Sequence, residues 1–521
     1  MRGRPLHHHQ SRSVFCFMLG LLMAATLIAA CSDPKVVRCP ARSIWVPVFF
    51  PVPSDAACTG AWLTFGFNTA RSEVNPGETI ITPATAGQLH RLWTHQLPQV
   101  ADSTPVLLPG LTLPDGTTRD ILYLTTKTGG LVALDAATGA QLWTQTTITN
   151  PDPNKMTTSS PVADPFEDVI YSYGLDGKLH RYRATTGQEM RGAGWPVKIT
   201  TMPASEKESS ALNAANGFIY VTTAGYAGDA PPYQGHVVVI NPAQGTSRVF
   251  NSLCARRAHL LAPGECAENG AGIWGRAGAV VDPTTGNIFV TTGNGPYTAN
   301  RGGDDWGDSV LELTADGARL VDAYTPTDPD GLYTQDLDLG SASPALLPAI
   351  LSSKTSYLAV QAGKEGLLRL LNRRNLSGQG GPGHLGGELQ TLDAPDHCPV
   401  LTQPAVWTDP AGGAIWVFVS NSCAIGGYQV ITSSQGVTRL HLMWSVGIGA
   451  TSPLVAGGVL FAATANNGLV ALDPSNGRRL WSSADPAAGG NIGAIHWESP
   501  IVAGGRLYCA DENGQITAYG L

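Results

Sequence analysis

Short apolar runs alternate with polar positions along most of the chain, and turns rich in Gly, Asp, Asn and Pro separate them. The clearest example is residues 131–143, LVALDAATGAQLW, and a close copy lies at residues 469–481. In each copy an apolar run enters a turn, and a second run leaves it and ends at Trp. Gly139 and Gly477 can adopt the positive φ that such a turn requires, because they carry no Cβ. Each copy is therefore predicted to be a β-hairpin.

Eight copies of a longer unit follow one another, each opening with a strand of small residues, often with Pro, and continuing with a β-rich strand. The units begin near residues 103, 160, 209, 278, 343, 403, 452 and 499. One hairpin cannot bury its apolar face alone, so the copies must stack. The last copy stops at Leu521 without its outer Trp strand, and residues 89–97 supply such a strand near the other end. The pattern predicts an all-β fold: an eight-bladed β-propeller of four-stranded blades over residues 62–521, its ring closed by an N-terminal strand that completes the last blade.

The composition agrees with many short strands. Hydrophobic residues make up 43% of the 521 residues and charged residues only 14%, with 61 Gly and 37 Pro. The formal net charge is −8, and no basic run is longer than two residues. A nucleic-acid-binding protein would show a basic patch or stripe, so we do not expect a nucleic-acid partner.

The first 30 residues have the pattern of an export signal. Arg2, Arg4 and Arg12 precede an apolar run at residues 14–30, and that run ends in Leu-Ile-Ala-Ala before Cys31. At 17 residues the run is short for a transmembrane anchor, and no charged stop follows it. The ending resembles the bacterial lipobox. It implies lipidation of Cys31 and a lipoprotein anchored to a membrane, facing the periplasm or the cell exterior, and on the outer membrane if the cell is Gram-negative. Residues 31–61 are predicted to be an irregular tether.

An exported chain meets an oxidising compartment, where disulfides are expected. Proximity in the sequence suggests three pairs and leaves Cys509 free; the pairs are Cys39–Cys58, Cys254–Cys266 and Cys398–Cys423. Sequence alone does not prove this connectivity. No C-x-x-C occurs, which gives no support to a zinc ribbon, thioredoxin chemistry or covalent c-type haem.

The A-x-D-x-x-[TN]-G-x-x-x-W hairpin resembles the tryptophan-docking motif of the quinoprotein dehydrogenase superfamily, the pyrroloquinoline quinone (PQQ) type of eight-bladed propeller. The resemblance covers residues 62–521. The same repeat occurs in non-enzymatic envelope proteins, among them the lipoprotein subunit of the outer-membrane β-barrel assembly machinery. Dehydrogenases of the family hold PQQ in the central channel over a Ca²⁺ ion, and the protein ligands of that ion are typically a Glu, an Asn and a nearby catalytic Asp.

The resemblance carries these roles to particular residues. The stretch 282–294 is similar to the family strand that leads to the metal-binding Asn, so Asn294 is the expected metal ligand. The loop 225–236 is similar to the loop with the metal-binding Glu, and its only acid is Asp229. The remaining expectations are Asp338, then Asp336, as the catalytic Asp, and Trp274, Arg276 and Lys364 as cofactor-binding residues.

Each residue also has a purely structural interpretation. Asn294 lies in Gly-Asn-Gly, which is typical of a tight turn. Asp338 could bond backbone amides at a strand end, and Trp274 could simply pack. The Asp-rich stretch 304–308 is either a Ca²⁺ site or a solvated loop.

Two classes of function follow. One is a non-catalytic envelope protein that binds or scaffolds a partner, which is favoured because the vicinal Cys pair of the dehydrogenases is absent. The other is a PQQ- and Ca²⁺-dependent dehydrogenase that oxidises the hydroxyl of a small alcohol or sugar. A single pocket lined by Asp229, Asn294, Asp338 and Trp274 would favour the enzyme.

Overall fold

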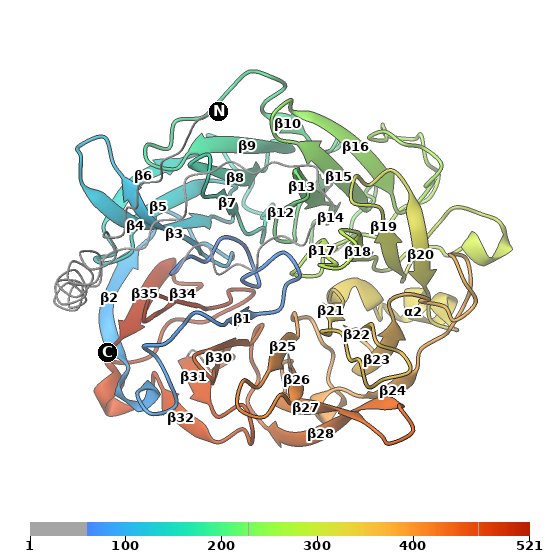
Figure 1. Cartoon of the computed structure of the whole chain (residues 1–521). Coiled ribbons are helices and arrows are strands. Elements are labelled where there is room, and N and C mark those ends of the chain that lie inside the picture. Colours follow the sequence, from blue (N-terminus) through green and yellow to red (C-terminus); the bar gives the residue numbers. More distant parts are fainter. Residues whose placement is uncertain (1–59, 228, 467) are drawn as a thin grey trace, which may run out of the picture.

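The computed structural model describes residues 60–227, 229–466 and 468–521. These residues form eight sheets of at least four strands, arranged in a ring (Figure 1). The four strands of each blade pair antiparallel with one another, and the first strand of each unit lies on one side of its blade. The predicted eight-bladed, all-β fold is confirmed.

The first four blades follow the order of the chain. Blade 1 consists of β3 (Val106–Thr112), β4 (Thr118–Thr125), β5 (Leu131–Asp135) and β6 (Gln141–Gln145). Blade 2 consists of β7 (Val162–Asp164), β8 (Val169–Gly174), β9 (Lys178–Arg183) and β10 (Val197–Lys198). Blade 3 consists of β12 (Asn213–Ala215), β13 (Phe218–Thr222), β15 (His236–Asn241) and β16 (Thr246–Asn251). Blade 4 consists of β17 (Val280–Val281), β18 (Ile288–Thr291), β19 (Val310–Leu313) and β20 (Leu320–Tyr324).

The other four blades complete the ring. Blade 5 consists of β21 (Ala345–Leu346), β22 (Leu358–Ala362), β23 (Leu367–Asn372) and β24 (Gln390–Asp393). Blade 6 consists of β25 (Ala405–Thr408), β26 (Ile415–Ser420), β27 (Ile425–Thr432) and β28 (Thr438–Val446). Blade 7 consists of β29 (Leu454–Ala456), β30 (Val459–Thr464), β31 (Gly468–Leu472) and β32 (Arg479–Ser482), with the short β1 (Val74–Asn75) added parallel to β29. Blade 8 consists of β33 (Ile501–Ala503), β34 (Arg506–Ala510), β35 (Gln515–Gly520) and β2 (His90–Gln96).

Elements outside the blades are few and short. They are the pair β11 (Glu206–Lys207) and β14 (Ala224–Gly225), the helix α2 (Pro329–Gln335), and 3₁₀ turns at Ala86–Gln88, Ala299–Arg301, Leu339–Ser341, Pro395–His397 and Pro486–Ala488. No helix among the described residues has the length and apolarity needed to cross a membrane.

The outer strand of blade 8 comes from the start of the described chain. Strand β2 pairs antiparallel with β35, and Thr94 lies opposite Thr517. The two hydroxyl oxygens are 3.0 Å apart. Residues separated by most of the chain therefore share one sheet.

Tryptophans of the outer strands join blades 1, 6, 7 and 8 to the blade that follows each of them. Trp143 of blade 1 donates from Nε1 to the carbonyl of Ala184 in blade 2, at 3.0 Å. Its ring covers Gly187 so closely that a Cβ there would lie 2.6 Å from the ring. Trp444 of blade 6 repeats the arrangement on Gly477 of blade 7. The Trp of one blade thus packs on the Asp/Gly turn of the next blade, which explains why the motif contains both the turn and the Trp.

The segment 62–82 crosses the middle of the ring and was not predicted; it is drawn in blue in Figure 1. Its main chain or side chains bond to the first strand of seven blades, or to the residue next to that strand. The partners are Leu107, Ala163, Leu212, Val281, Val406, Val455 and Val502. The sequence of this crossing segment has no repeat and only one two-residue strand, so no pattern marks it.

Both predicted disulfides in the described part of the chain are present, Cys254–Cys266 and Cys398–Cys423. Cys509 is free and buried, as expected. The predicted pair Cys39–Cys58 and the lipidation site Cys31 lie outside the described residues.

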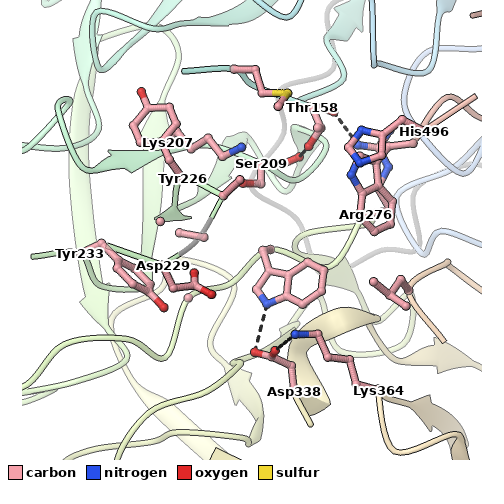
Figure 2. Close-up of a pocket in the computed structure, with 18 residues that line it drawn as sticks. Thr158, Lys207, Ser209, Tyr226, Asp229, Tyr233, Arg276, Asp338, Lys364 and His496 are labelled. Atoms are coloured by element: carbon pink, nitrogen blue, oxygen red, sulfur yellow. Dashed lines mark hydrogen bonds and ion pairs between the residues drawn. The ribbon is translucent and has the colours of Figure 1, made fainter. Parts of the chain in front are cut away.

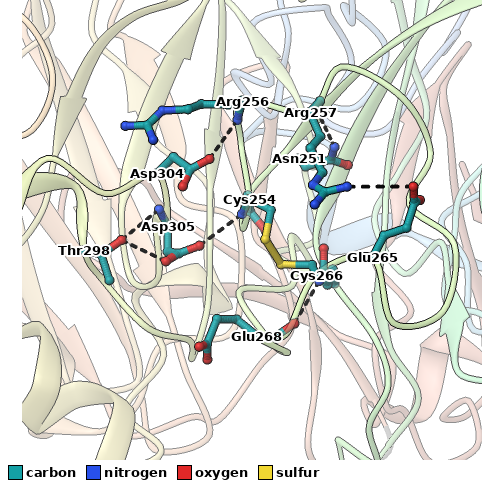
Figure 3. The surroundings of a disulfide bond; sticks show 12 residues. Asn251, Cys254, Arg256, Arg257, Glu265, Cys266, Glu268, Thr298, Asp304 and Asp305 are labelled. Carbon is teal, nitrogen blue, oxygen red and sulfur yellow. Dashed lines mark hydrogen bonds and ion pairs between the residues drawn. A yellow bond between two sulfur atoms is a disulfide. The ribbon is translucent and has the colours of Figure 1, made fainter.

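The Asp-rich stretch 304–308 fastens the first disulfide loop (Figure 3). Asp305 accepts the Cys254 amide at 3.0 Å and the Thr298 hydroxyl at 2.8 Å. Asp304 accepts the Arg256 amide at 3.0 Å. The carboxylates of Asp304 and Asp305 therefore bond to donors of the protein and hold the disulfide loop, which is a structural role.

Candidate functional site

One cavity of about 290 Å³ opens where loops from several blades meet (Figure 2). The polar and aromatic residues that line it are Thr158, Lys207, Ser209, Tyr226, Asp229, Tyr233, Trp274, Arg276, Asp338, Lys364, His496 and Trp497. We call this cavity the pocket.

Two kinds of loop build the pocket. The first kind leads from the outer strand of one blade to the first strand of the next, and it brings Thr158, Trp274, Asp338 and Trp497. The second kind joins the second and third strands of a blade, and it brings Asp229 and Lys364 in blades 3 and 5. Equivalent loops of neighbouring blades lie at the same end of the ring, so residues far apart in the chain meet there.

Asp338 lies at the centre of the polar side of the pocket and bonds to three other residues. Its Oδ1 accepts the amide of Asn294 at 2.7 Å and Nε1 of Trp274 at 3.3 Å. Its Oδ2 forms a salt bridge with Nζ of Lys364. Gly293 leaves the room for this arrangement, because a Cβ there would collide with Asp338 Oδ1. A side chain at position 293 would therefore displace the carboxylate.

Asn294 lies beside the pocket at the start of the β18–β19 loop. Its side-chain nitrogen donates to Asp336 Oδ1 at 2.5 Å. Its Oδ1 is buried and has no hydrogen-bond partner among the described residues. A buried carbonyl oxygen without a donor is costly, so this atom is suited to a cation or a ligand donor.

Lys364 joins the two acids of the Asp-x-Asp motif. Its ammonium is 3.0 Å from Asp336 Oδ1 and lies 5.3 Å from the centre of the Trp274 ring. Burial lowers the pKa of Lys364, but Asp338 and Asp336 outweigh it and leave the pKa raised. Asp336 itself is 68% exposed and does not line the pocket. Lys364 is therefore a firmly charged group at the pocket wall.

Asp229 faces the pocket from blade 3, beside Tyr233 (Figure 2). Burial raises its pKa, and the carboxylates of Asp338 and Asp336 raise it further, against the lowering effects of Tyr233 and Lys364. The carboxylates of Asp229 and Asp338 both line this side of the pocket, so acidic groups accumulate there. Such accumulation favours a bound cation.

Two cationic side chains line the opposite side. Lys207 is almost fully buried and forms no salt bridge within the described residues; burial lowers its pKa to about 8. Arg276 donates to the carbonyl of Thr158 at 2.5 Å, but its Nε and Nη2 find no partner in the described part of the chain. The guanidinium carbon of Arg276 lies over the ring of Phe65 in the crossing segment, 5.5 Å from the ring centre. Unpaired buried cations are suited to an anionic ligand.

The structure thus brings Asp229, Trp274, Arg276, Asp338 and Lys364 to one pocket, with Asn294 bonded to it and Asp336 outside it. The sequence analysis missed lining residues of the loops that lead into blades 2, 3 and 8, namely Thr158, Lys207, Ser209, His496 and Trp497, and the tyrosines Tyr226 and Tyr233 of blade 3. Thr158, Lys207, His496 and Trp497 come shortly before the small-residue strand of a unit, as Asp338 does, and Ser209 begins one. This shared position is the signal that could have found them.

A family model described as the glucose/ethanol/alcohol dehydrogenase β-propeller domain matches residues 62–379. A second model, described as the outer membrane protein assembly factor BamB, matches residues 407–520. No curated protein sequence matches the chain significantly.

Among solved structures, the fold is similar to that of two quinohemoprotein alcohol dehydrogenases. The enzyme of Comamonas testosteroni has a TM-score of 0.62 and 16% identity, over 90% of this chain and 81% of that chain. The enzyme of Pseudomonas putida HK5 has a TM-score of 0.61 and 16% identity, over 89% and 80%. BamB of Moraxella catarrhalis has a TM-score of 0.50 and 13% identity, over 83% and 100%. At these identities the likeness establishes the fold.

Proposed function

Because the chain belongs to the family of glucose/ethanol/alcohol dehydrogenase β-propeller domains, we propose that its pocket oxidises a hydroxyl group of a small alcohol or sugar, with PQQ and Ca²⁺ bound. The observation that carries the proposal is the buried Oδ1 of Asn294, which has no hydrogen-bond partner among the described residues, together with the Asp338 carboxylate that accepts the amide of the same Asn. Ca²⁺ takes carboxylate and carbonyl oxygens as ligands. Asn294, Asp338 and Asp229 are the residues that would hold the ion.

The lining also fits a planar, anionic cofactor. Trp274 offers an aromatic face, and the cations Lys207, Arg276 and Lys364 surround the same space. The cavity, about 290 Å³, is near the lower limit of ordinary ligand pockets, about 300 Å³. When bound, PQQ would supply an acceptor for the two electrons and the hydrogen of the carbinol carbon.

The chain's own residues position the reaction. Asn294 and Trp274 fix the Asp338 carboxylate by two hydrogen bonds, and Lys364 balances its charge. The crossing segment packs beneath Arg276, with Phe65 against the guanidinium, so a ligand would reach the pocket from the loop-bearing end of the ring. These contacts are made by the protein's own side chains and backbone, which favours a preorganised site.

A titration of the purified protein with PQQ, in the presence and absence of Ca²⁺, tests the proposal. We expect saturable one-to-one binding that requires Ca²⁺. Asn294→Ser should weaken the apparent Ca²⁺ affinity by about 10-fold or more, because it removes an expected ligand. Asn476→Ser, in the exposed turn of the second hairpin, is the matched control and should bind as the original protein does. Binding that is absent, or indifferent to Ca²⁺ and to position 294, would contradict the proposal.

A second candidate function has its own support in the BamB match over residues 407–520. In this alternative the propeller binds or scaffolds an envelope protein and carries out no reaction. Under either function we propose export and anchoring through lipidated Cys31, supported by the lipobox-like sequence before it. Capture of an envelope protein by a variant that binds no PQQ would favour the second candidate.

A further inference from the structure

Three donors of the protein bond to the carboxylate of Asp338 and stabilise its charged form. Both of its oxygens are engaged, Oδ1 by Asn294 and Trp274 and Oδ2 by the Lys364 ammonium. A proton from a substrate hydroxyl would compete at Asp338 with these donors and would neutralise the partner of the Lys364 ammonium. The pocket contains a second basic group for which this obstacle does not exist.

That group is His496, in the loop before β33. Its Nδ1 lies 2.7 Å from Oδ2 of Asp102, a carboxylate that is completely buried. The other oxygen of Asp102 accepts the amide of Trp497 at 2.8 Å, and the amide of His496 donates to Glu498 at 2.6 Å. Two buried acids therefore hold the backbone and the ring of His496 in one orientation.

The bond to Asp102 also selects the tautomer. A neutral imidazole that donates from Nδ1 keeps its lone pair on Nε2. No residue in the described part of the chain bonds to Nε2, and the side chain is half exposed on the pocket wall (Figure 2). The pairing has the same logic as a His–Asp pair that serves as a general base.

The charges around the pair are balanced within the protein. The ammonium of Lys127 is 3.7 Å from Asp102 and 2.6 Å from Glu512. Ligand atoms of Asp102, His496 and Glu512 converge as a metal site would require, but the Lys127 ammonium already lies against both carboxylates. The groups that face His496 are thus the acids Asp102, Glu498 and Glu512 and the cation Lys127, with Arg276 on the same wall of the pocket.

We propose that His496 is the residue that takes the hydroxyl proton of the substrate, and that Asp102 is its positioning residue. The proposal rests on the proposed dehydrogenase function. The O–H bond of the substrate breaks and its proton goes to Nε2. The carbinol C–H bond breaks as a carbonyl forms, and the hydrogen leaves with two electrons to an oxidant of the quinone class. The half-exposed imidazolium then returns the proton to water.

The first test uses the protein without any cofactor. Nitrogen-15 spectra of histidine-labelled protein should show His496, assigned from its loss in His496→Gln, with the proton on Nδ1 when the ring is neutral. Asp102→Asn should shift the tautomer toward Nε2. His441→Gln, on the exposed face of β28, is the control that leaves the His496 signal unchanged. A resting Nε2–H tautomer in the unaltered protein would overturn the proposal.

The second test uses protein loaded with PQQ and Ca²⁺, an artificial electron acceptor, and a panel of primary alcohols and aldoses. His496→Ala should lower kcat by about 100-fold or more with little change in KM. Added imidazole should restore part of the rate, which a purely structural role would not allow. If the original protein and the His496→Ala variant turn over equally well, the role of His496 is overturned and the proposed dehydrogenase function stands. If the original protein shows no turnover on any alcohol or aldose of the panel, the proposed function and this proposal are overturned together.

Discussion

At the scale of single residues, the structural and the functional interpretations of one position turn out to be compatible. Asn294 is the residue of a tight turn, and its amide in that turn is what holds Asp338. Asp338 does bond a backbone amide at a strand end, and the same carboxylate lines the pocket. One residue can both form a turn and serve the pocket, because the loops between strands are also the parts of each blade that supply side chains to the pocket.

Asp308, in the loop before β19, provides a residue-scale prediction about pH. It is completely buried, accepts the Leu339 amide at 2.9 Å, and burial raises its pKa to about 8. In the unfolded chain the carboxyl of Asp308 has its ordinary pKa of 3.8 and loses its proton above that pH, whereas the folded protein keeps the proton up to about pH 8. The free energy of unfolding therefore falls as pH rises from about 4 to 8. Asp308→Asn should remove this loss and raise Tm relative to the original protein by about 2 °C at pH 8.

Scanning calorimetry at pH 5 and pH 8 checks this prediction. The two proteins should differ little at pH 5, where the carboxyl of Asp308 is protonated. Asp396→Asn is the matched control, since Asp396 has the same positive φ but is exposed. An equal Tm difference at both pH values would show that Asp308 does not carry the proton.

At the scale of elements, a Trp that packs on the next hairpin joins blade 6 to blade 7 and blade 8 to blade 1. Trp444 donates to the Pro474 carbonyl at 2.9 Å and covers Gly477, whose φ is +70°. Trp93 covers Gly139 in the same way across the junction of blades 8 and 1. The repeated motif is thus an interface between blades, and its presence says nothing about chemistry in the pocket.

Gly477→Ala provides the prediction at this scale. The new Cβ would lie 2.6 Å from the Trp444 ring, in addition to the cost of a positive φ. We expect the free energy of unfolding to fall by about 2 kcal/mol or more. Gly413→Ala isolates the backbone cost, because Gly413 has φ +69° and no atom within 4 Å of its Cβ position. Equal destabilisation of both variants in thermal unfolding would refute a contribution from the Trp dock.

At the scale of the whole molecule, the crossing segment ties the blades together from inside. Arg71 is completely buried and donates to carbonyls of Phe65, Ala211, Leu212 and Ala277, which belong to the segment and to blades 3 and 4. A ring held only at its outer Trp docks could open at any junction. Contacts from one segment to seven blades make such opening more costly.

Arg71→Met is the corresponding prediction. It would leave several buried carbonyls without a donor, and each such group costs about 1–3 kcal/mol. We expect apparent Tm to fall by several degrees and the tryptophan fluorescence of the original fold to be retained below the transition. Arg478→Met removes an arginine that is 69% exposed and should leave Tm almost unchanged, since surface ion pairs contribute little. A similar Tm for both variants would contradict the role of the crossing segment.

The sequence by itself determined the blades, because each blade depends on short-range patterns: alternation along a strand, a turn with Gly, and a Trp at a fixed distance. It also indicated Asp338, Asn294 and Trp274, which lie in stretches with a recognisable motif. Only the tertiary structure decided that His496 and Asp102, nearly four hundred residues apart, form one pair, and that residues 62–82 cross the ring. The sequence predicts that the ring closes, but no local pattern records which loops and side chains meet inside the closed ring.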